Sequence, residues 1–496
     1  MSRRLDSERI AAPESVRQKV QRDYERFATS GLPTSLEQYL LDEYDLDVTA
    51  EYAGFPIKNP WGKASGQLSM TARQVEEDVA AGLGFVVLKT VIAQDERGDQ
   101  SMAAWAIQEA RMVAEPIVGQ SGEPGWTITW KGRGWWQPFE AYLQLIRDAR
   151  RIADGSSTLI VPSCKYHLPS PNEPEWHVGE YDFTTAKLLE AWQPNGSPMP
   201  LEKDFSPTLA GSDLAAAKAK ILEWLRVVPK LIHDSATRSG LGQVRVGMKL
   251  FNALFDDGFQ LEMLDAIHGA AADRPEFFIY ANRLFDPHRE FDGQRGVAYG
   301  GPDLSDRNLR VLDQWRQKLA RSESEGVELQ ARPNGADISQ PRASDHRERR
   351  PGSESDLSSE ALKGRHQFNE PSSVAPSGLQ EIGSTCEPRA LPWAGIATPL
   401  WGWHRQVVLP WSATGNITTG KMAVEYLRRG ATSFQLHTFF QLPAEHFSMK
   451  VGNRTQRALH ELYFHPQTGF VVWLHHLANQ LGLPSRPIRL LDIARG

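Results

Sequence analysis

Eight short apolar segments, most of them separated by helical patterns, constrain the fold of this chain more than any other feature of its sequence. The run GFVVLKT is typical, because it is short, apolar and β-branched like a parallel strand that is covered on both faces. Eight such strands alternating with helices favour an α/β fold, a (β/α)8 TIM barrel. A doubly wound open sheet is the main alternative, although no G-x-G-x-x-G segment opens a helix after the first strand. The other expected strands are the run ending in Lys63-Ala64-Ser65-Gly66, and TLIVPSC, MPLEKDFS, VRVGMKL, EFFIYAN, QVVLPWS and TSFQLHT.

The segments around these strands predict the rest of the organisation. The segment LDVTAEYAGFPIKNP predicts a hairpin with its turn at Ala53-Gly54, and Thr71 with Gln74 three residues on predicts the start of a helix. A long stretch before the seventh strand is rich in Ser, Pro, Glu and Arg, so it cannot bury enough apolar surface and we expect a disordered insert there. We therefore expect an N-terminal helical segment with a barrel-bottom hairpin (1–58), strands one to six (59–320), the low-complexity insert (321–403), and strands seven and eight with C-terminal helices (404–496).

Composition excludes several classes of function. The formal net charge is -6, which argues against a general nucleic-acid or membrane-surface binder. No apolar run approaches the roughly 20 residues that span a bilayer, and the first residues lack the apolar centre of a secretory signal. The two cysteines, Cys164 and Cys386, cannot form a disulfide framework, which favours a reducing compartment. We expect a cytoplasmic protein that acts on a small molecule, binds no nucleic acid, and has the homodimer as its candidate assembly.

In a barrel, functional residues lie at the carboxyl ends of the strands. The first strand ends in Ala64-Ser65-Gly66, whose small residues let backbone amides approach a ligand, although a simple turn explains them equally well. The second ends in Lys89-Thr90, and the fifth carries Lys249 near its end. Two lysines that end apolar runs need anionic partners unless they reach solvent, so they could converge on a phosphate or an electron-rich ring. Asn282 ends the sixth strand, as a ligand contact or a polar cap.

The last two strands carry the strongest local signal. Thr414-Gly415-Asn416 follows the seventh strand and precedes a helix, and His437-Thr438 follows the eighth. Loops at these two positions of a barrel commonly cradle a phosphate with backbone amides and a helix N-terminus, whereas in isolation they would be ordinary turns. Four tryptophans lie close together in the sequence, and they either pack in the core or form an aromatic wall over a ligand. They are Trp126, Trp130, Trp135 and Trp136.

These segments together resemble the dihydroorotate dehydrogenase family and the related barrel domain of dihydropyrimidine dehydrogenase. The opening NPWGKASGQLSMTARQVEEDVAAGLGFVVLKT is similar to the family's Asn-Pro strand, Ala-Ser-Gly turn and Lys-Thr strand end. The segment VGMKL resembles its Val-Lys-Leu strand, and GGPDL resembles the segment that carries its flavin-contacting pair. The segment SATGNITTGKMAVEYLRRGATSFQLHT is similar to its phosphate segment, helix and last strand. The resemblance runs from about Ala53 to Phe440, without the insert.

The resemblance implies FMN as the cofactor and hydride transfer between a substrate CH–CH bond and the flavin. Backbone of the first strand end would contact the flavin, the two lysines would lie against its ring, and the seventh and eighth strands would hold its phosphate. No iron–sulfur cluster or other metal is expected, because the cysteines do not cluster. The implied cofactor residues are Ala64, Ser65, Gly66, Lys89, Thr90, Lys249, Asn282, Gly300, Gly301, Thr414, Gly415, Asn416, His437 and Thr438.

The substrate half departs from the family pattern. Counting elements, Ser206 takes the place of the catalytic base, and Cys164 in the third strand is the alternative. Lys203 and Thr208 replace two pyrimidine-binding asparagines, and TITWKGRGWW stands near the position of another family segment, with Trp130 close to the pocket. A site built for a pyrimidine would lose affinity without those amides, so we expect a different substrate. The hypothesis is an FMN-dependent oxidoreductase, and the alternatives are a non-catalytic flavin- or phosphate-binding barrel and a flavin-free lyase or isomerase acting on a phosphorylated substrate.

Overall fold

A computed structural model describes most of the chain outside one long segment. The described residues divide into two units, and the first unit, Met1–Ser324 with Val407–Gly496, contains all the strands and nearly all the helices. The second unit, Glu325–Gln406, is described only to residue 331, as the end of a helix. Nearly all of the predicted insert and Cys386 lie outside the described residues. The described residues are 5, 10–106, 108, 114–128, 134–173, 175–193, 196–205, 214–252, 256–269, 274–291, 294–331, 409–483 and 487–495.

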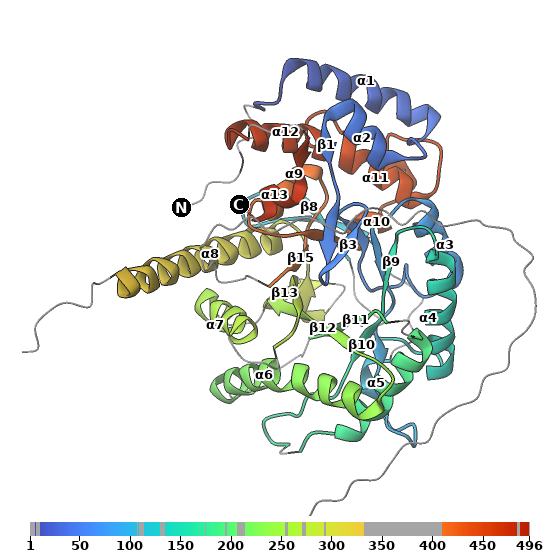
Figure 1. The fold of residues 1–496 in the computed structure, drawn as a ribbon, viewed down its shortest axis with the longest axis vertical. Helices are drawn as coiled ribbons and strands as arrows, with labels where there is room; N and C mark the ends of the chain where they lie inside the picture. The colour runs from blue at the N-terminus through green and yellow to red at the C-terminus, as the bar shows by residue number, and fades with distance from the viewer. Residues whose placement is uncertain are drawn as a thin grey trace, which may run out of the picture. The chain divides into compact units, whose positions relative to one another are not determined.

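A curled sheet, parallel along its main path, lies at the centre of the first unit (Figure 1). Its strands pair in the order β6-β10-β11-β12-β13-β15-β16-β4-β5-β9, every pair in this path is parallel, and β14 (Gln294–Tyr299) adds to β13 in the antiparallel sense. The mixed α/β class is thereby confirmed. The parallel strands are β4 (Trp61–Lys63), β5 (Phe85–Val87), β6 (Val91–Ile92), β9 (Leu159–Val161), β10 (Ser163–Lys165), β11 (Met199–Asp204), β12 (Val244–Asn252), β13 (Phe277–Phe291), β15 (Trp411–Thr414) and β16 (Ser433–Leu436).

Helices surround this sheet, and the described residues contain thirteen of them (Figure 1). The predicted capping box is present at Thr71 and Gln74, where α3 begins. The start of the predicted insert, residues 321–331, is helical, because α8 continues to Ala331 instead of ending near 320. The helices are α1 (Glu14–Ser30), α2 (Leu36–Tyr44), α3 (Ala72–Ala80), α4 (Phe139–Ala153), α5 (Val178–Trp192), α6 (Leu214–Ser239), α7 (Asp257–His268), α8 (Pro302–Ala331), α9 (Gly420–Leu427), α10 (Thr438–Gln441), α11 (Arg454–Phe464), α12 (Phe470–Gln480) and α13 (Leu490–Arg495).

Three small two-stranded sheets flank the main one. The predicted hairpin is formed by β2 (Ala50–Tyr52) and β3 (Phe55–Ile57), and both residues of its turn, Ala53 and Gly54, have positive φ. A second hairpin, β7 (Ala114–Val118) with β8 (Pro124–Ile128), was not predicted. The third sheet pairs β1 (Leu46–Asp47) with β17 (Ile488–Arg489). Short 3-10 turns, η1 (Ala103–Trp105) and η2 (Ala444–His446), complete the assigned elements.

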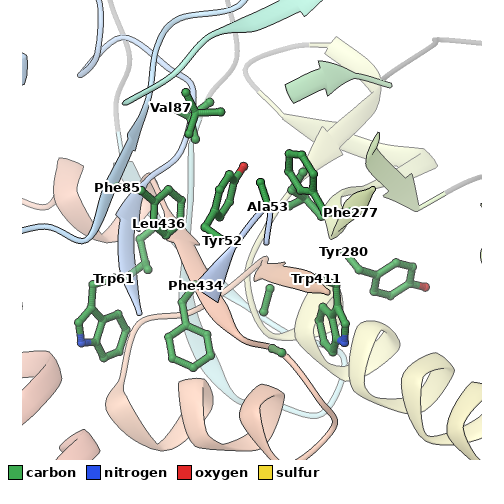
Figure 2. Packing of buried hydrophobic residues seen from close by; sticks show 14 of the residues in the cluster. Tyr52, Ala53, Trp61, Phe85, Val87, Phe277, Tyr280, Trp411, Phe434 and Leu436 are labelled. Atoms are coloured by element: carbon green, nitrogen blue, oxygen red, sulfur yellow. The ribbon is translucent and has the colours of Figure 1, made fainter. Parts of the chain in front are cut away.

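Aromatic rings fill the end of the sheet next to the β2–β3 hairpin. Tyr52 stacks on Phe85 with 4.2 Å between ring centroids and meets Phe277 edge-on at 5.2 Å (Figure 2). Glycines on the strands make room for these rings, since a Cβ at Gly62 would lie 2.2 Å from Phe85 and one at Gly247 would lie 2.1 Å from Phe277. The core at this end is therefore packed with large side chains, and space for a ligand lies elsewhere.

The described helices contain no segment that is both long enough and apolar enough to cross a bilayer.

Candidate functional site

A pocket of about 730 Å³, part of it open to solvent, lies at the carboxyl ends of the parallel strands. The loops after β4, β15 and β16, the strand β13 and the start of α8 contribute to its wall, and Trp126 of β8 adds an aromatic side chain. Most of the residues predicted to bind the cofactor line the pocket, although they are far apart in the sequence. These are Ala64, Ser65, Lys249, Asn282, Gly300, Gly301, Thr414, Gly415, Asn416, His437 and Thr438.

The loop after β15 has a backbone that only particular residues can adopt. Gly415 has φ +104°, and a Cβ there would lie 2.9 Å from Nδ2 of Asn308 on α8. The amide of Asn308 lies 3.1 Å from the carbonyl oxygen of Thr414 and 3.2 Å from that of Ala281, so it joins the ends of β15 and β13. Asn416, also at positive φ, donates to Ser305 Oγ, while its own Oδ1 is buried without a hydrogen-bond partner. Residues of α8 thus fix the loop by hydrogen bonds, and the loop places Asn416 at the pocket.

The helix after this loop, α9, begins at Gly420. Thr419 caps it, since its hydroxyl accepts a hydrogen bond from the amide of Met422. Gly420 is enclosed by protein, because a Cβ there would lie 2.0 Å from the backbone nitrogen of Phe470. The order of strand, glycine loop and helix is the one that the sequence predicted, and the cap at Thr419 is an addition that the structure shows.

His437, just after β16, has two ring nitrogens that are buried and have no hydrogen-bond partner among the described residues. Burial and the positive charges of Lys89, Lys63 and other cations lower the pKa of His437 to about 3, so the ring is neutral. The ring lies against Gly66, where a Cβ would be only 2.0 Å from Nε2. Buried polar groups in proteins nearly always have a partner. A neutral imidazole with both nitrogens unused is therefore suited to a polar ligand.

Lys249, on β12, lies at the pocket with its ammonium group nearly fully buried. Its Nζ donates to Glu202 Oε1 at 2.8 Å and to Gln435 Oε1 at 3.3 Å. The prediction that a lysine at this place needs an anionic partner is confirmed, and the partner is a glutamate of β11.

Lys89 follows β5 and is also buried, and no hydrogen bond or ion pair of its amine occurs within the described residues. Burial and the positive charge of Arg283 lower the pKa of Lys89 to about 7, against the opposing effect of Asp204. Its neighbour Thr90 shares a hydrogen bond with Ser65 at 2.8 Å and another with Ser163 at 2.9 Å. Gly66, Lys89 and Thr90 are thus beside the pocket without being part of its lining.

The structure does not bring Cys164 or Lys203 to the pocket. Both are fully buried on adjacent strands, paired in register, and neither belongs to the lining. Burial raises the pKa of Cys164, so its thiol is protonated and is a poor base. The amine of Lys203 donates to the backbone oxygen of Asp204 at 2.7 Å, and burial and Lys165 lower its pKa to about 7.

The residue after Lys203 carries the charge that faces the lysines. Asp204 Oδ2 lies 2.8 Å from Lys165 Nζ, and the positive charges of Lys165, Lys249 and Lys203 outweigh burial and hold the pKa of Asp204 well below its usual range. Successive side chains of a strand point to opposite faces, which explains why Asp204 and not Lys203 pairs with Lys165. The other proposed substrate and base residues, Ser206, Thr208 and Trp130, lie outside the described residues.

The hairpin β7–β8 supports the glycine pair that leads into α8. The amide of Gly300 donates to Thr127 Oγ1 at 3.0 Å, and Gly301 has φ +90° with Ile117 so close that a Cβ would lie 2.7 Å from its methyl group. Trp126 of the same hairpin lines the pocket. The sequence had marked Trp126 only as one of four neighbouring tryptophans.

Sequence reasoning missed other residues of the site. Arg283 and Gln435 line the pocket, and Glu202 binds Lys249 behind it. Glu202 and Gln435 had a signal in the sequence, because each is a polar residue inside an apolar strand run. A buried polar residue of that kind needs a partner, and here the partners are each other and Lys249.

One group of side chains in the described part of the chain has the composition of a metal site: His167, Glu173 and His177. Both Nε2 atoms approach Glu173 Oε1, at 3.1 Å and 3.3 Å. The two imidazole rings, however, stack face to face with centroids 3.9 Å apart, so their in-plane lone pairs cannot meet at one ion. His167 Nδ1 also accepts the backbone N–H of His177, whereas a histidine that binds metal through Nε2 normally donates from Nδ1. The group is better described as a hydrogen-bonded cluster.

Comparison with families of known proteins and with curated proteins finds no match for this chain. Its function must therefore be inferred from the geometry and chemistry of the pocket.

Proposed function

We propose that this chain is an FMN-dependent oxidoreductase of the dihydroorotate dehydrogenase-like type, in which a small substrate exchanges a hydride with the flavin. The observation that carries the proposal is the convergence of residues from the first, fifth, sixth, seventh and eighth predicted strand ends on one pocket. They were selected from sequence segments that span more than 370 positions, from Ala64 to Thr438. Apart from Gly66, Lys89 and Thr90, every predicted cofactor residue is in the lining.

We further infer that the sheet closes into an eight-stranded barrel. The two ends of the pairing path, β6 and β9, are halves of interrupted strands: β5 and β6 are three residues apart, and β9 and β10 are one residue apart. The pairs β5–β9 and β6–β10 then count as one strand pair, and the amide of Leu88 between them donates to Val161 O at 2.9 Å. With the other six parallel strands this makes eight positions in a ring, the arrangement expected of a TIM barrel.

The pocket residues fit a phosphate-bearing flavin. Gly301 and Gly415 belong to the lining and have positive φ, a backbone conformation that glycine adopts without strain. Within the described part of the chain, His437 and Asn416 offer buried polar atoms without partners, and Lys249 places an ammonium group in the lining. We assign Thr414, Gly415, Asn416, His437 and Thr438 to the phosphate, and Ala64, Ser65, Lys249 and Asn282 to the ring.

When bound, FMN would supply the hydride-transfer chemistry, and the protein would supply binding, orientation and electrostatics. Lys249, paired with Glu202, would place its ammonium group beside the ring, and the hydroxyl of Ser65 would be oriented by Thr90. Lys89, whose pKa is about 7, can hold or release a proton at neutral pH. We keep Ser206 as the expected base. The substrate we propose is small and is not dihydroorotate, because by the resemblance Lys203 and Thr208 take the place of two pyrimidine-binding asparagines.

Purification of the full chain tests the proposal. A yellow protein that releases FMN, and whose colour is bleached anaerobically by a reducing substrate, is expected. Lys249→Ala should abolish the FMN content, whereas Lys58→Ala, which removes a half-buried lysine outside the pocket lining, should retain it. A colourless protein that cannot be loaded with FMN would refute the proposal, and specific binding of phosphorylated compounds by such a protein would favour the lyase or isomerase. A flavin that no substrate reduces would favour a binding role.

A further inference from the structure

A closed network of hydrogen bonds lies directly behind Lys249. Glu202 is fully buried, and its Oε1 accepts from Lys249 Nζ at 2.8 Å. Its Oε2 accepts from Gln435 Nε2 at 2.7 Å and from the hydroxyl of Tyr52 at 3.2 Å. Gln435 Nε2 also lies 2.8 Å from the Tyr52 hydroxyl. Both oxygens of the carboxylate are thus used, and its negative charge is hydrogen-bonded to the ammonium group that Lys249 places at the pocket.

Tyr52 brings the β2–β3 hairpin into this network. The hairpin is attached to the opposite, N-terminal ends of the strands: Arg245 Nη1 donates to Ala53 O at 2.6 Å, and Thr432 Oγ1 donates to Glu51 O at 2.8 Å. The ring of Tyr52 lies between Phe85 and Phe277, and these two contacts restrict the movement of its hydroxyl (Figure 2). A chain of contacts therefore runs from the hairpin through the sheet to the pocket.

We propose that Glu202 is a positioning residue that fixes Lys249 and cancels its charge at the cofactor pocket, and that Tyr52 of the hairpin holds Glu202 in place. The inference rests on the proposed function, since it concerns the site assigned to FMN. The hairpin then has a role beyond covering the end of the sheet, because it determines where the ammonium group at the pocket stands.

The physical consequence is a pair with no net charge beside the flavin ring. Reduction adds negative charge to a flavin, so a nearby positive charge makes the midpoint potential more positive and a negative charge makes it more negative. Glu202→Gln removes the negative charge that is hydrogen-bonded to Lys249, whereas Lys249→Gln removes the positive charge that is hydrogen-bonded to Glu202. The two substitutions should therefore shift the potential in opposite directions, and a variant with both should return close to the wild-type value.

The experiment measures the FMN dissociation constant, the two-electron midpoint potential and the melting temperature of the full-length protein and its variants. Glu202→Gln should shift the midpoint potential to more positive values. Lys249→Gln should shift it to more negative values and weaken FMN binding by about tenfold or more. The double variant should have a midpoint potential close to that of the wild type. The double variant also guards against misfolding, because it buries no unpaired charge. Tyr52→Phe, which keeps all charges, should weaken FMN binding while shifting the potential less than either charge variant.

A matched control is Glu425→Gln. Glu425 is a buried carboxylate paired with Arg429 at 2.7 Å, outside the pocket lining, and its removal should leave the potential unchanged. Shifts of the same sign in both charge variants, or a double variant far from wild type, would overturn the role of Glu202. Unchanged FMN binding in Tyr52→Phe would overturn the role of the hairpin. A wild-type protein that binds no FMN would instead overturn the proposed function, and this inference with it.

Discussion

The buried imidazole of His437 predicts a specific loss of stability in mildly acidic solution. Its pKa is lowered to about 3 in the folded protein, chiefly by burial and then by the charge of Lys89, from an ordinary value of 6.5. As the pH falls below 6.5, the unfolded chain takes up a proton at this position and the folded chain does not. The contribution is therefore absent above that pH, grows as the pH falls, and levels off near pH 3.

The magnitude follows from the two pKa values. Each pH unit well inside this window costs about 1.4 kcal/mol, and protonation of the unfolded chain is half complete at pH 6.5. Between pH 7.5 and 5.5, His437 should thus lower the free energy of unfolding by about 1.4 kcal/mol. Other histidines with lowered pKa, such as His167 and His460, act in the same direction. A variant without the imidazole is needed to separate them.

The assay is urea unfolding of the flavin-free wild type and of His437→Gln at pH 7.5, 6.5 and 5.5. Both proteins share every other titrating group, so the difference between their unfolding free energies isolates His437. This difference should move by about 1.4 kcal/mol in favour of the variant between pH 7.5 and 5.5. Parallel pH dependences would show that the imidazole titrates normally in the folded state, which would contradict its burial without partners.

Three further outcomes follow from the same contacts. Asp78→Ala leaves the buried ammonium of Lys63 without its carboxylate partner at 2.9 Å, and it should lower the free energy of unfolding in urea by about 3–5 kcal/mol. Adding Lys63→Met should recover most of this loss. A loss below about 1 kcal/mol would contradict the buried ion pair. Gly415→Ala should lower the unfolding free energy by about 2–3 kcal/mol, more than Gly482→Ala, because Gly482 has φ +61° but nothing within 4 Å of an added Cβ. Equal losses in the two variants would show that crowding at Gly415 does not contribute. Lys89→Met should stabilise the flavin-free protein by about 1 kcal/mol or more at pH 7 and should weaken FMN binding. The reason is that burial of the amine destabilises the folded protein, whereas the amine contributes to ligand binding. A loss of thermal stability would argue for a structural role.

Much of the fold could be predicted from local patterns. The strand segments, the capping box at Thr71 and the hairpin turn at Ala53-Gly54 all lie where the sequence indicated. Each of these depends on side chains within a few residues, so the preference is present in the segment itself. The helix α5 was missed, although its buried face, with Tyr181 and Leu188 among its residues, has helical spacing. The hairpin β7–β8 and the strand β14 were also missed, because they lie in loops whose alternation is weak.

The same distinction between local and long-range interactions applies to the site. The sequence by itself determined which glycines, lysines and polar residues end the strands, and a barrel hypothesis was enough to predict that they meet. Only the tertiary structure decided which side chain of a pair faces inward, since a shift of one residue along a strand reverses its face. That is why Asp204 and Glu202 stand among the lysines while Lys203 and Cys164 are buried away from the pocket. The chemical type of each residue can be read from the sequence, whereas the partner of a buried charge depends on which strands from distant parts of the chain pair with one another.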